Sequence, residues 1–397
     1  MNLIFRLCCF VLFLSSCRTS EERALQEINV VLTESAEQYR LLAARLPEGK
    51  FPVSYFEGQD SLAVTSSRGW VSGFYPGVLL YLYGETGKEA LLKEAVHMLD
   101  FLKNEQFNTR THDIGFMMYC SFGNALRVAP QPEYPKILEN SAESLIRRYE
   151  PNVGCIKSWD SSDSSFLVII DNMMNLELLF HVSEATGNPI YRDIAISHAD
   201  HTMQHHFRAD YSSYHVINYD AKTGTIIQKR TAQGASDESA WARGQAWGLY
   251  GYTMVYRFTK DRKYLDFARK IATFLLEHPN MPDDYVPYWD FDVTSGPKDA
   301  SAAAIIASGL LELCRYTDAD ASREYLAIAR KILQTLSGDA YRAQKGDNGG
   351  FLLRHSVGNL PGNRDVDVPL IYTDYYYIEA LIRLKKLQEE IIIHGDL

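Results

Sequence analysis

The strongest constraint on the fold is a short turn-forming segment that recurs between predicted helices. Residues 82–87, 183–187, 256–261 and 315–318 each end an apolar periodic segment with turn-forming Thr, Gly, Lys or Asp residues, and a new periodic segment follows. Apolar residues recur at helical spacing on both sides of each turn-forming segment, which indicates that each of these turns joins two helices. The pattern predicts a diverged helix-hairpin repeat.

Helical periodicity covers most of the chain. The segments predicted as helices are 25–46, 89–104, 134–149, 172–186, 191–206, 245–258, 263–278, 302–316, 324–336 and 374–388. Strand signals are few, and a hairpin is expected from 214–218 and 225–229 with its turn at 222–224. The long connections are rich in Gly, Trp and His, which favours a closed ring with a cleft over an open solenoid.

The N-terminal residues are predicted to be a leader. Arg6 precedes a short apolar stretch at 7–14, which is too short to span a bilayer. Residues 14–17, Leu-Ser-Ser-Cys, resemble the bacterial lipobox, so we expect a signal peptide at 1–16 and a lipid on Cys17 that anchors the protein to a membrane. A tether at 17–24 and a single helical domain at 25–397 would follow, and a plain signal peptide is the alternative.

Net charge and cysteine content limit the kinds of binding partner that the sequence predicts. The formal net charge is −10, which disfavours polyanions, so nucleic acid is not an expected partner. Behind the leader remain Cys120, Cys155 and Cys314, an odd number that indicates no disulfide framework, and no CxxC or Cys/His spacing indicates zinc. The sequence indicates no metal, no cofactor and no obligate protein partner.

Asp171 is the first candidate for chemistry. Five apolar residues, 166–170, run directly into this carboxylate, and the predicted helix 172–186 follows it. Its side chain could cap that helix by accepting from backbone N–H groups. Alternatively, burial among Met and Ile would raise its pKa and make it a proton donor near neutral pH.

Two other connections carry candidate residues. Residues 68–77 place Trp70 among glycines, where its ring could stack on a sugar or simply pack in a turn. Residues 111–116 place Asp113 beside His112 at a helix entrance, where capping is the favoured interpretation and a site the alternative.

The segment 233–247 is unusually polar for a core helix. It holds Gln233, Trp241, Arg243 and Trp247, a combination of a carboxylate-binding fork and flat aromatic faces that favours function. Four histidines, His198, His201, His205 and His206, share the helix 191–206. No carboxylate or HExxH pattern accompanies them, so a solvated helix face is favoured over a metal site.

Taken together, segments 70–77, 112–116, 170–175, 236–247 and 367–376 resemble glycoside hydrolase family 88, the unsaturated glucuronyl hydrolases. The resemblance spans about residues 30–385. It implies an all-α fold, the (α/α)6 barrel or six-hairpin toroid, in agreement with the hairpin repeat.

The resemblance also implies an activity. Enzymes of this family remove the 4,5-unsaturated uronic acid that polysaccharide lyases leave at a non-reducing end, by hydrating its double bond. By resemblance Asp171 is the general acid/base and Asp113 the assisting carboxylate. The residues that match the family's pocket are Trp70, His112, His215, Gln233, Trp241, Arg243 and Trp247. Among them, Arg243 is expected to hold the substrate carboxylate, with stacking surface from Trp241 and Trp247.

Two alternatives remain open at this point. A related hydrolase of the same fold could act on unsaturated rhamnogalacturonan instead of glycosaminoglycan-type products. A lipoprotein of the cell surface that only captures glycans would bind without turnover, but would leave the Asp171–Asp113 pair unexplained.

Overall fold

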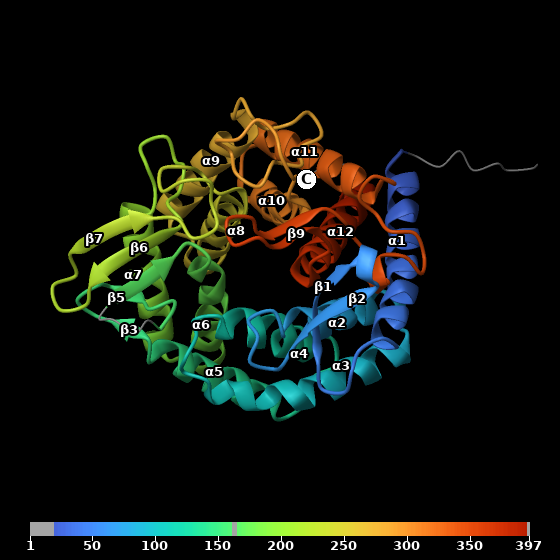
Figure 1. The fold of residues 1–397 in the computed structure, drawn as a ribbon, viewed down its shortest axis with the longest axis horizontal. Helices are drawn as coiled ribbons and strands as arrows, with labels where there is room; N and C mark the ends of the chain where they lie inside the picture. Colours follow the sequence, from blue (N-terminus) through green and yellow to red (C-terminus); the bar gives the residue numbers. More distant parts are fainter. Residues whose placement is uncertain (1–19, 161–164, 395–397) are drawn as a thin grey trace, which may run out of the picture.

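A computed structural model of the protein describes residues 20–160 and 165–394. Its helices form two concentric rings (Figure 1). The inner ring consists of α2 (Phe74–Thr86), the π-helix η3 (Gly115–Gly123) continued by α4 (Asn124–Val128), α6 (Asn172–Thr186), α8 (Ala242–Thr259), α10 (Ala300–Leu313) and α12 (Ile371–His394). Neighbours in this list pack against each other, and α12 packs against α2, so the ring closes.

The outer ring lies on the perimeter of Figure 1. Its members are α1 (Ser20–Ala43), α3 (Glu89–Leu102), α5 (Tyr134–Ile146), α7 (Pro189–His205), α9 (Arg262–Glu277) and α11 (Ala319–Ser337). These helices are covered on one side only. In α9, for example, the buried residues Tyr264, Leu265, Ala268, Ile271, Ala272 and Leu275 recur at helical spacing, as expected for an amphipathic helix.

Inner helices are covered on all sides. Every residue of α10 is buried, and its small side chains at Ala302, Ala303 and Ala304 let α8, α11 and α12 approach closely. This packing explains why the segment is apolar all round and shows little amphipathic pattern.

Short strands occupy the connections at the N-terminal ends of the inner helices. One hairpin pairs β1 (Phe51–Phe56) with β2 (Ser61–Thr65), and another pairs β8 (Ser356–Asn359) with β9 (Arg364–Val368). A three-stranded antiparallel sheet contains β5 (Ser165–Ile169), β6 (Val216–Asp220) and β7 (Ile226–Arg230), and it projects at the left of Figure 1. A minimal pair, β3 (Tyr149–Glu150) and β4 (Cys155–Ile156), completes the strands of the described residues.

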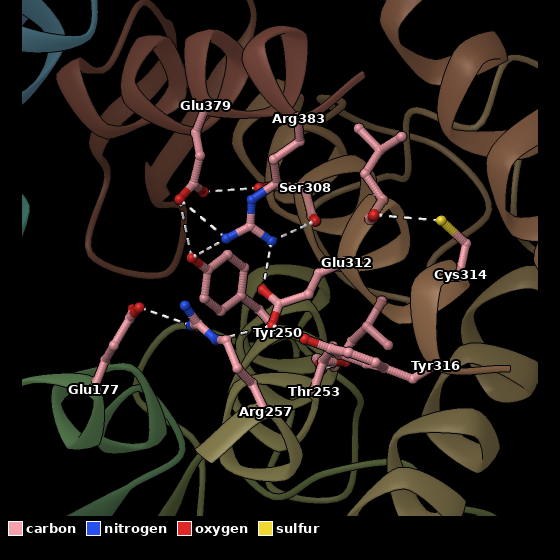
Figure 2. A network of polar contacts seen from close by, with 12 residues as sticks. Glu177, Tyr250, Thr253, Arg257, Ser308, Glu312, Cys314, Tyr316, Glu379 and Arg383 are labelled. Atoms are coloured by element: carbon pink, nitrogen blue, oxygen red, sulfur yellow. Dashed lines mark hydrogen bonds and ion pairs between the residues drawn. The ribbon is translucent and has the colours of Figure 1, made fainter. Parts of the chain in front are cut away.

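Further along the inner helices, charged side chains form a network inside the ring (Figure 2). Arg257 pairs with Glu177 at 2.7 Å and with Glu312 at 3.0 Å, and Arg383 pairs with Glu312 at 2.7 Å and Glu379 at 3.2 Å. These residues come from α6, α8, α10 and α12, so the ion pairs tie four inner helices together. Each buried charge has an opposite partner, as burial requires.

The predicted all-α hairpin ring is confirmed, with differences in detail. Helix α6 covers the predicted 172–186. The predicted strand hairpin is present as β6 and β7, and β6 begins two residues later than predicted. Helix α2, the π-helix η3, strand β5 and the hairpins β1–β2 and β8–β9 were not predicted. Helix α1 begins at Ser20, so residues 20–24, predicted as the end of a tether, are already helical.

The predicted leader and Cys17 lie outside the described residues. Within residues 20–160 and 165–394, no helix is both long enough and apolar enough to cross a membrane. The three described cysteines, Cys120, Cys155 and Cys314, are buried and unpaired.

Candidate active site

A cavity of about 730 Å³ opens at the N-terminal ends of the inner helices. The hairpins β1–β2 and β8–β9 form part of its wall through residues such as Val64 and Arg364. It brings together six residues predicted from sequence: Trp70, His112, Asp113, Asp171, Gln233 and Arg243. Residues far apart in the chain therefore converge on one concave site, as expected of a ligand pocket.

Asp171 does not cap α6. The residue has helical φ and ψ angles of −55° and −26°, and its carboxylate makes no hydrogen bond to the first turn. The side chain is 13% exposed, and its Oδ2 atom has no hydrogen-bond partner among the described residues. Of the two interpretations of the sequence, the capping role is wrong.

Burial raises the pKa of Asp171 to about 7. The positive charge of Arg243 opposes this shift, and the negative charge of Asp113 adds to it. The strand β5 delivers the carboxyl into this setting, because Val168, Ile169 and Ile170 are buried and carry the chain straight into the ring interior. A carboxyl with a pKa of this value is half protonated at neutral pH and suits general acid catalysis.

His215 faces the same carboxyl with a defined tautomer. Its Nδ1 atom accepts hydrogen bonds from the backbone N–H groups of Ala232 and Gln233, both at 3.2 Å. Burial, and next the charge of Arg243, hold its pKa well below the usual range, so the ring is neutral. A neutral ring that accepts at Nδ1 carries its proton on Nε2, and Nε2 lies 3.7 Å from Asp171 Oδ2.

Asp113 also lies in the cavity wall. Its carboxylate accepts from the Thr111 hydroxyl at 2.7 Å, and its Oδ1 is 3.3 Å from Nε2 of the fully buried His112. The backbone carbonyl of Asp113, not its side chain, bonds into the helix by accepting from Met117 N–H. The favoured capping role for Asp113 is therefore wrong as well.

Trp247 and Trp241 lie behind the cavity wall. Trp247 is fully buried, with its ring against Phe116 and Tyr376 at centroid distances of 5.3 Å. Its indole N–H has no hydrogen-bond partner among the described residues, and it lowers the pKa of Asp171, which places it near that carboxyl. Trp241 stacks on His215 at 4.5 Å. Neither ring face is free for a sugar, which corrects the expected stacking role, whereas the partly exposed Trp70 lines the cavity.

Arg243 is occupied by protein groups. Its Nη1 atom donates to the Asp299 carboxylate at 3.0 Å and to the Val357 carbonyl, and its Nη2 donates to Gln233 Oε1 and the Gly358 carbonyl, both at 2.8 Å. Arg243 was expected to hold the substrate carboxylate, and in this structure both of its Nη atoms already donate to protein groups. Because Gln233 accepts through Oε1, its amide NH₂ is the end left to face the cavity.

Several lining residues were not predicted as site residues. Trp159, Arg364, Asp365 and Tyr372 all line the cavity. Tyr372 lies within the segment 367–376 that carries the family resemblance, so its position was available from sequence, but its contact with Arg243, 5.2 Å from guanidinium carbon to ring centroid, was not. Arg364 and Asp365 lie in β9, and nothing in the sequence indicated their place in the site, since the strand itself was not predicted.

The histidines of α7 do not form a metal site. Among the described residues, no group of His, Cys, Asp or Glu is arranged to hold a metal ion. His198 and His206 are fully buried, and burial lowers both pKa values, so the expected solvated face is wrong for these two. His198 instead accepts from the backbone N–H of Ile156 at 3.0 Å and helps to fix β4.

Comparison with known proteins identifies relatives over most of the chain. A model of Glycosyl Hydrolase Family 88 matches residues 49–386. The unsaturated glucuronyl hydrolase of Formosa agariphila is 45% identical over 343 residues, which cover 85% of this chain and 85% of that protein. The unsaturated glucuronyl hydrolase of Bacillus sp. strain GL1 is 34% identical over 341 residues, covering 83% of this chain and 90% of that protein.

A solved structure agrees as well. The crystal structure of an unsaturated glucuronyl hydrolase specific for heparin matches with a TM-score of 0.89 at 45% identity, over 92% of this chain and 98% of that one. The helical ring, the acid in its cavity and the match along most of the sequence lead to one conclusion: this chain belongs to glycoside hydrolase family 88.

Proposed function

We propose that the protein is an unsaturated glucuronyl hydrolase that releases 4,5-unsaturated uronic acid from the non-reducing end of lyase-generated oligosaccharides of the glycosaminoglycan type. The observation that carries the proposal is Asp171, a buried carboxyl with a pKa raised to about 7 in the wall of a sugar-sized cavity. Such a carboxyl can give a proton and take one back at the same pH.

The reaction follows from the chemistry of the substrate. The C4=C5 bond and the ring oxygen form a vinyl ether, which accepts a proton at C4. Protonated Asp171 supplies that proton, and the positive charge that results is shared by C5 and the ring oxygen. Water then adds at C5 and gives its proton to the Asp171 carboxylate, which restores the acid. The hemiketal at C5 then opens: the bond from C5 to the ring oxygen breaks, C5 becomes a ketone, and the C5 hydroxyl proton passes to the former ring oxygen. This leaves a hemiacetal at C1. Its hydroxyl proton passes to the glycosidic oxygen as the bond from C1 to the aglycone breaks, so C1 becomes an aldehyde and the aglycone leaves as an alcohol.

Neighbouring groups support both charge states of Asp171. Once the proton has moved to C4, the new carboxylate faces the Nε2–H of His215 and lies near the indole N–H of Trp247. Donors to a carboxylate favour its ionised form. The negative charge of Asp113 favours the protonated form and can stabilise the cation at C5. The acid is thus held between opposing influences that keep its pKa near neutrality.

The cavity also offers a charge for an anionic aglycone. Arg364 is exposed, lines the cavity, and makes no ion pair among the described residues. Because the chain as a whole is acidic, an anionic substrate needs such local attraction. A sulfated glycosaminoglycan fragment has this chemistry, and one structural relative is named as specific for heparin.

One assay tests the proposal. Loss of the absorbance of the conjugated C4=C5 bond is measured on unsaturated disaccharides from heparin, chondroitin and hyaluronan, with unsaturated rhamnogalacturonan fragments in parallel. We expect turnover on glycosaminoglycan products. Turnover on the pectin-derived fragment alone would identify the rhamnogalacturonyl alternative, and binding without turnover on any substrate would identify a glycan-capture protein.

We also propose that the protein is attached to a bacterial membrane through a lipid on Cys17, on the periplasmic or cell-surface side. The support is the Leu-Ser-Ser-Cys sequence at 14–17 behind a short apolar stretch. Fractionation of native protein and of Cys17→Ala behind a cleavable signal tests this. Membrane association of the native form that is lost in the variant is expected, and a fully soluble native form would contradict it.

A further inference from the structure

Asp299 is a buried carboxylate outside the cavity, directly before α10. The residue is fully buried, and its Oδ1 accepts from the Ser301 N–H at 3.0 Å, the Ser301 hydroxyl at 2.6 Å and the Val357 N–H at 3.3 Å. Its Oδ2 is left for Arg243 Nη1 at 3.0 Å. The carboxylate therefore joins the start of α10, strand β8 and the start of α8 at one point.

Through Arg243, this carboxylate acts on the cavity wall. The guanidinium that it holds donates to the carbonyls of Val357 and Gly358 and to Gln233 Oε1. Gly358 and Gln233 both line the cavity, so the orientation of the hairpin β8–β9 and of the Gln233 amide depends on where Arg243 is held. Val357 is linked twice, because its N–H donates to Asp299 and its carbonyl accepts from Arg243.

Arg243 is also the cation whose charge lowers the pKa of Asp171. Charged and titratable groups reach Asp171 from several elements: Arg243 from α8, Asp113 from the segment before η3, His215 from the segment before β6, and Tyr372 from α12. Of these, the His215 ring is neutral, and the Asp113 carboxylate raises the pKa of Asp171. The guanidinium is thus the positive charge facing Asp171, and a shorter distance between the two would favour the ionised carboxylate.

We propose that Asp299 is a positioning residue for the reaction: it keeps Arg243 on Gln233 and the β8–β9 hairpin, and away from the acid Asp171. The inference rests on the proposed function and names a residue that does not touch the substrate. The pairing uses the fork geometry of arginine, in which one nitrogen pairs with the carboxylate while the other remains free for the wall.

The test is the substitution Asp299→Asn, which keeps the shape of the side chain. With Oδ1 still accepting from Ser301, the new amide places N–H groups against the N–H groups of Arg243. With donors on both sides this contact is lost, and the carboxylates that line the cavity with Arg243, namely Asp113, Asp171 and Asp365, become alternative partners for the guanidinium. The pKa of Asp171, about 7, predicts an alkaline fall of kcat/KM in the parent, and in the variant we expect the midpoint of this fall to lie about one pH unit lower.

A matched control is Asp290→Asn. Asp290 is also fully buried and also accepts from a serine hydroxyl, Ser239 at 2.7 Å, and from backbone N–H groups, but no ion pair joins it among the described residues. Its replacement should leave the midpoint where the parent has it, whatever the effect on rate. A second control repeats Asp299→Asn in an Arg243→Gln background, where the midpoint should no longer respond to the change.

Each outcome decides the matter. A lowered midpoint in Asp299→Asn that disappears in the Arg243→Gln background supports the inference. An unmoved midpoint, or a shift that persists without Arg243, overturns it, as does an equal shift in Asp290→Asn. Should Asp299→Asn fail to fold, Arg243→Gln alone must raise the midpoint, and no rise overturns the inference. A parent protein that leaves the C4=C5 absorbance unchanged would instead overturn the proposed function.

Discussion

Asp171 allows a test that needs no substrate, because its pKa makes stability depend on pH. The carboxyl is buried in the folded protein, where burial raises its pKa to about 7. In the unfolded chain an aspartate titrates at about 3.9. Between these values the folded protein binds a proton that the unfolded chain has released, so stability falls as pH rises.

The size of the effect follows from the gap between the two pKa values. A raised folded-state pKa contributes stability that is fully present below about pH 4 and is lost as pH rises through about 7. A gap of about three units, at about 1.4 kcal/mol per unit, corresponds to about 4 kcal/mol. Asp171→Asn cannot ionise and escapes this loss. We therefore expect the variant to be more stable than the parent at about pH 8, by up to about 4 kcal/mol, and equally stable near pH 4. Its turnover should fall by about 10²–10⁴ because the proton donor is gone.

The measurement is urea unfolding of parent and variant across this pH range. Asp220→Asn is a control of opposite sign, because the backbone N–H groups of Thr223 and Lys222 lower the pKa of that carboxyl. Its stability contribution is present above the unfolded-state pKa and is lost in acid, so this variant should be less stable than the parent at neutral pH. If the free energies of unfolding of the parent and Asp171→Asn change in parallel with pH, Asp171 does not have a raised pKa in the folded protein. This conclusion would hold whatever the loss of turnover in the variant.

Three further outcomes are expected. Arg364→Ala should raise KM on sulfated substrates, reduce its dependence on salt, and have little effect on an unsulfated disaccharide; an equal effect on both would contradict a role in anion attraction. Arg243→Ala leaves Asp299 buried without its partner and should cost about 3–5 kcal/mol of unfolding free energy, measured in denaturant; a loss below about 1 kcal/mol would show that the pair is not needed for the fold. Trp247→Phe keeps the ring packing on Phe116 but removes the indole N–H that lowers the pKa of Asp171, so the alkaline midpoint of kcat/KM should rise; a fall would place that N–H elsewhere.

The parts of the fold that depend on local patterns could be predicted from sequence. The turn-forming segment at 183–187 predicted the end of a helix at residue 186, and α6 ends there, with Gly187 at a φ of 71°. Only a residue without a side chain adopts this angle freely, so the signal is local and reliable. The strand β5 was not predicted, because five apolar residues in a row fit a buried strand and a buried helix equally well.

The roles in the site depend on contacts between distant residues. Both aspartates were ambiguous, since capping and catalysis use the same side chain at the same kind of position. The structure decides against capping, because the Asp171 side chain makes no cap hydrogen bond and the Asp113 carboxylate accepts from Thr111. Arg243 was predicted as a site residue and lines the cavity, but the protein groups that hold it were not predicted. The carbonyl of Gly358 that it binds lies 115 residues further along the chain, in a hairpin with no signal in the sequence.

The closure of the ring has a consequence for the order of folding. Tyr39 of α1 donates to Asp374 of α12 at 3.0 Å, across 335 residues of sequence, and the same carboxylate accepts from the N–H groups of Leu352 and Leu353. On the ribosome, hairpins such as α6–α7 can form as they emerge, but α1 cannot complete its packing until α12 has been synthesised. A nascent chain short of α12 therefore exposes the apolar sides of α2 and α10, the two inner helices that α12 covers. Truncations that remove α12 should accordingly aggregate instead of yielding a smaller active enzyme, and chaperone demand should persist until α12 has been synthesised.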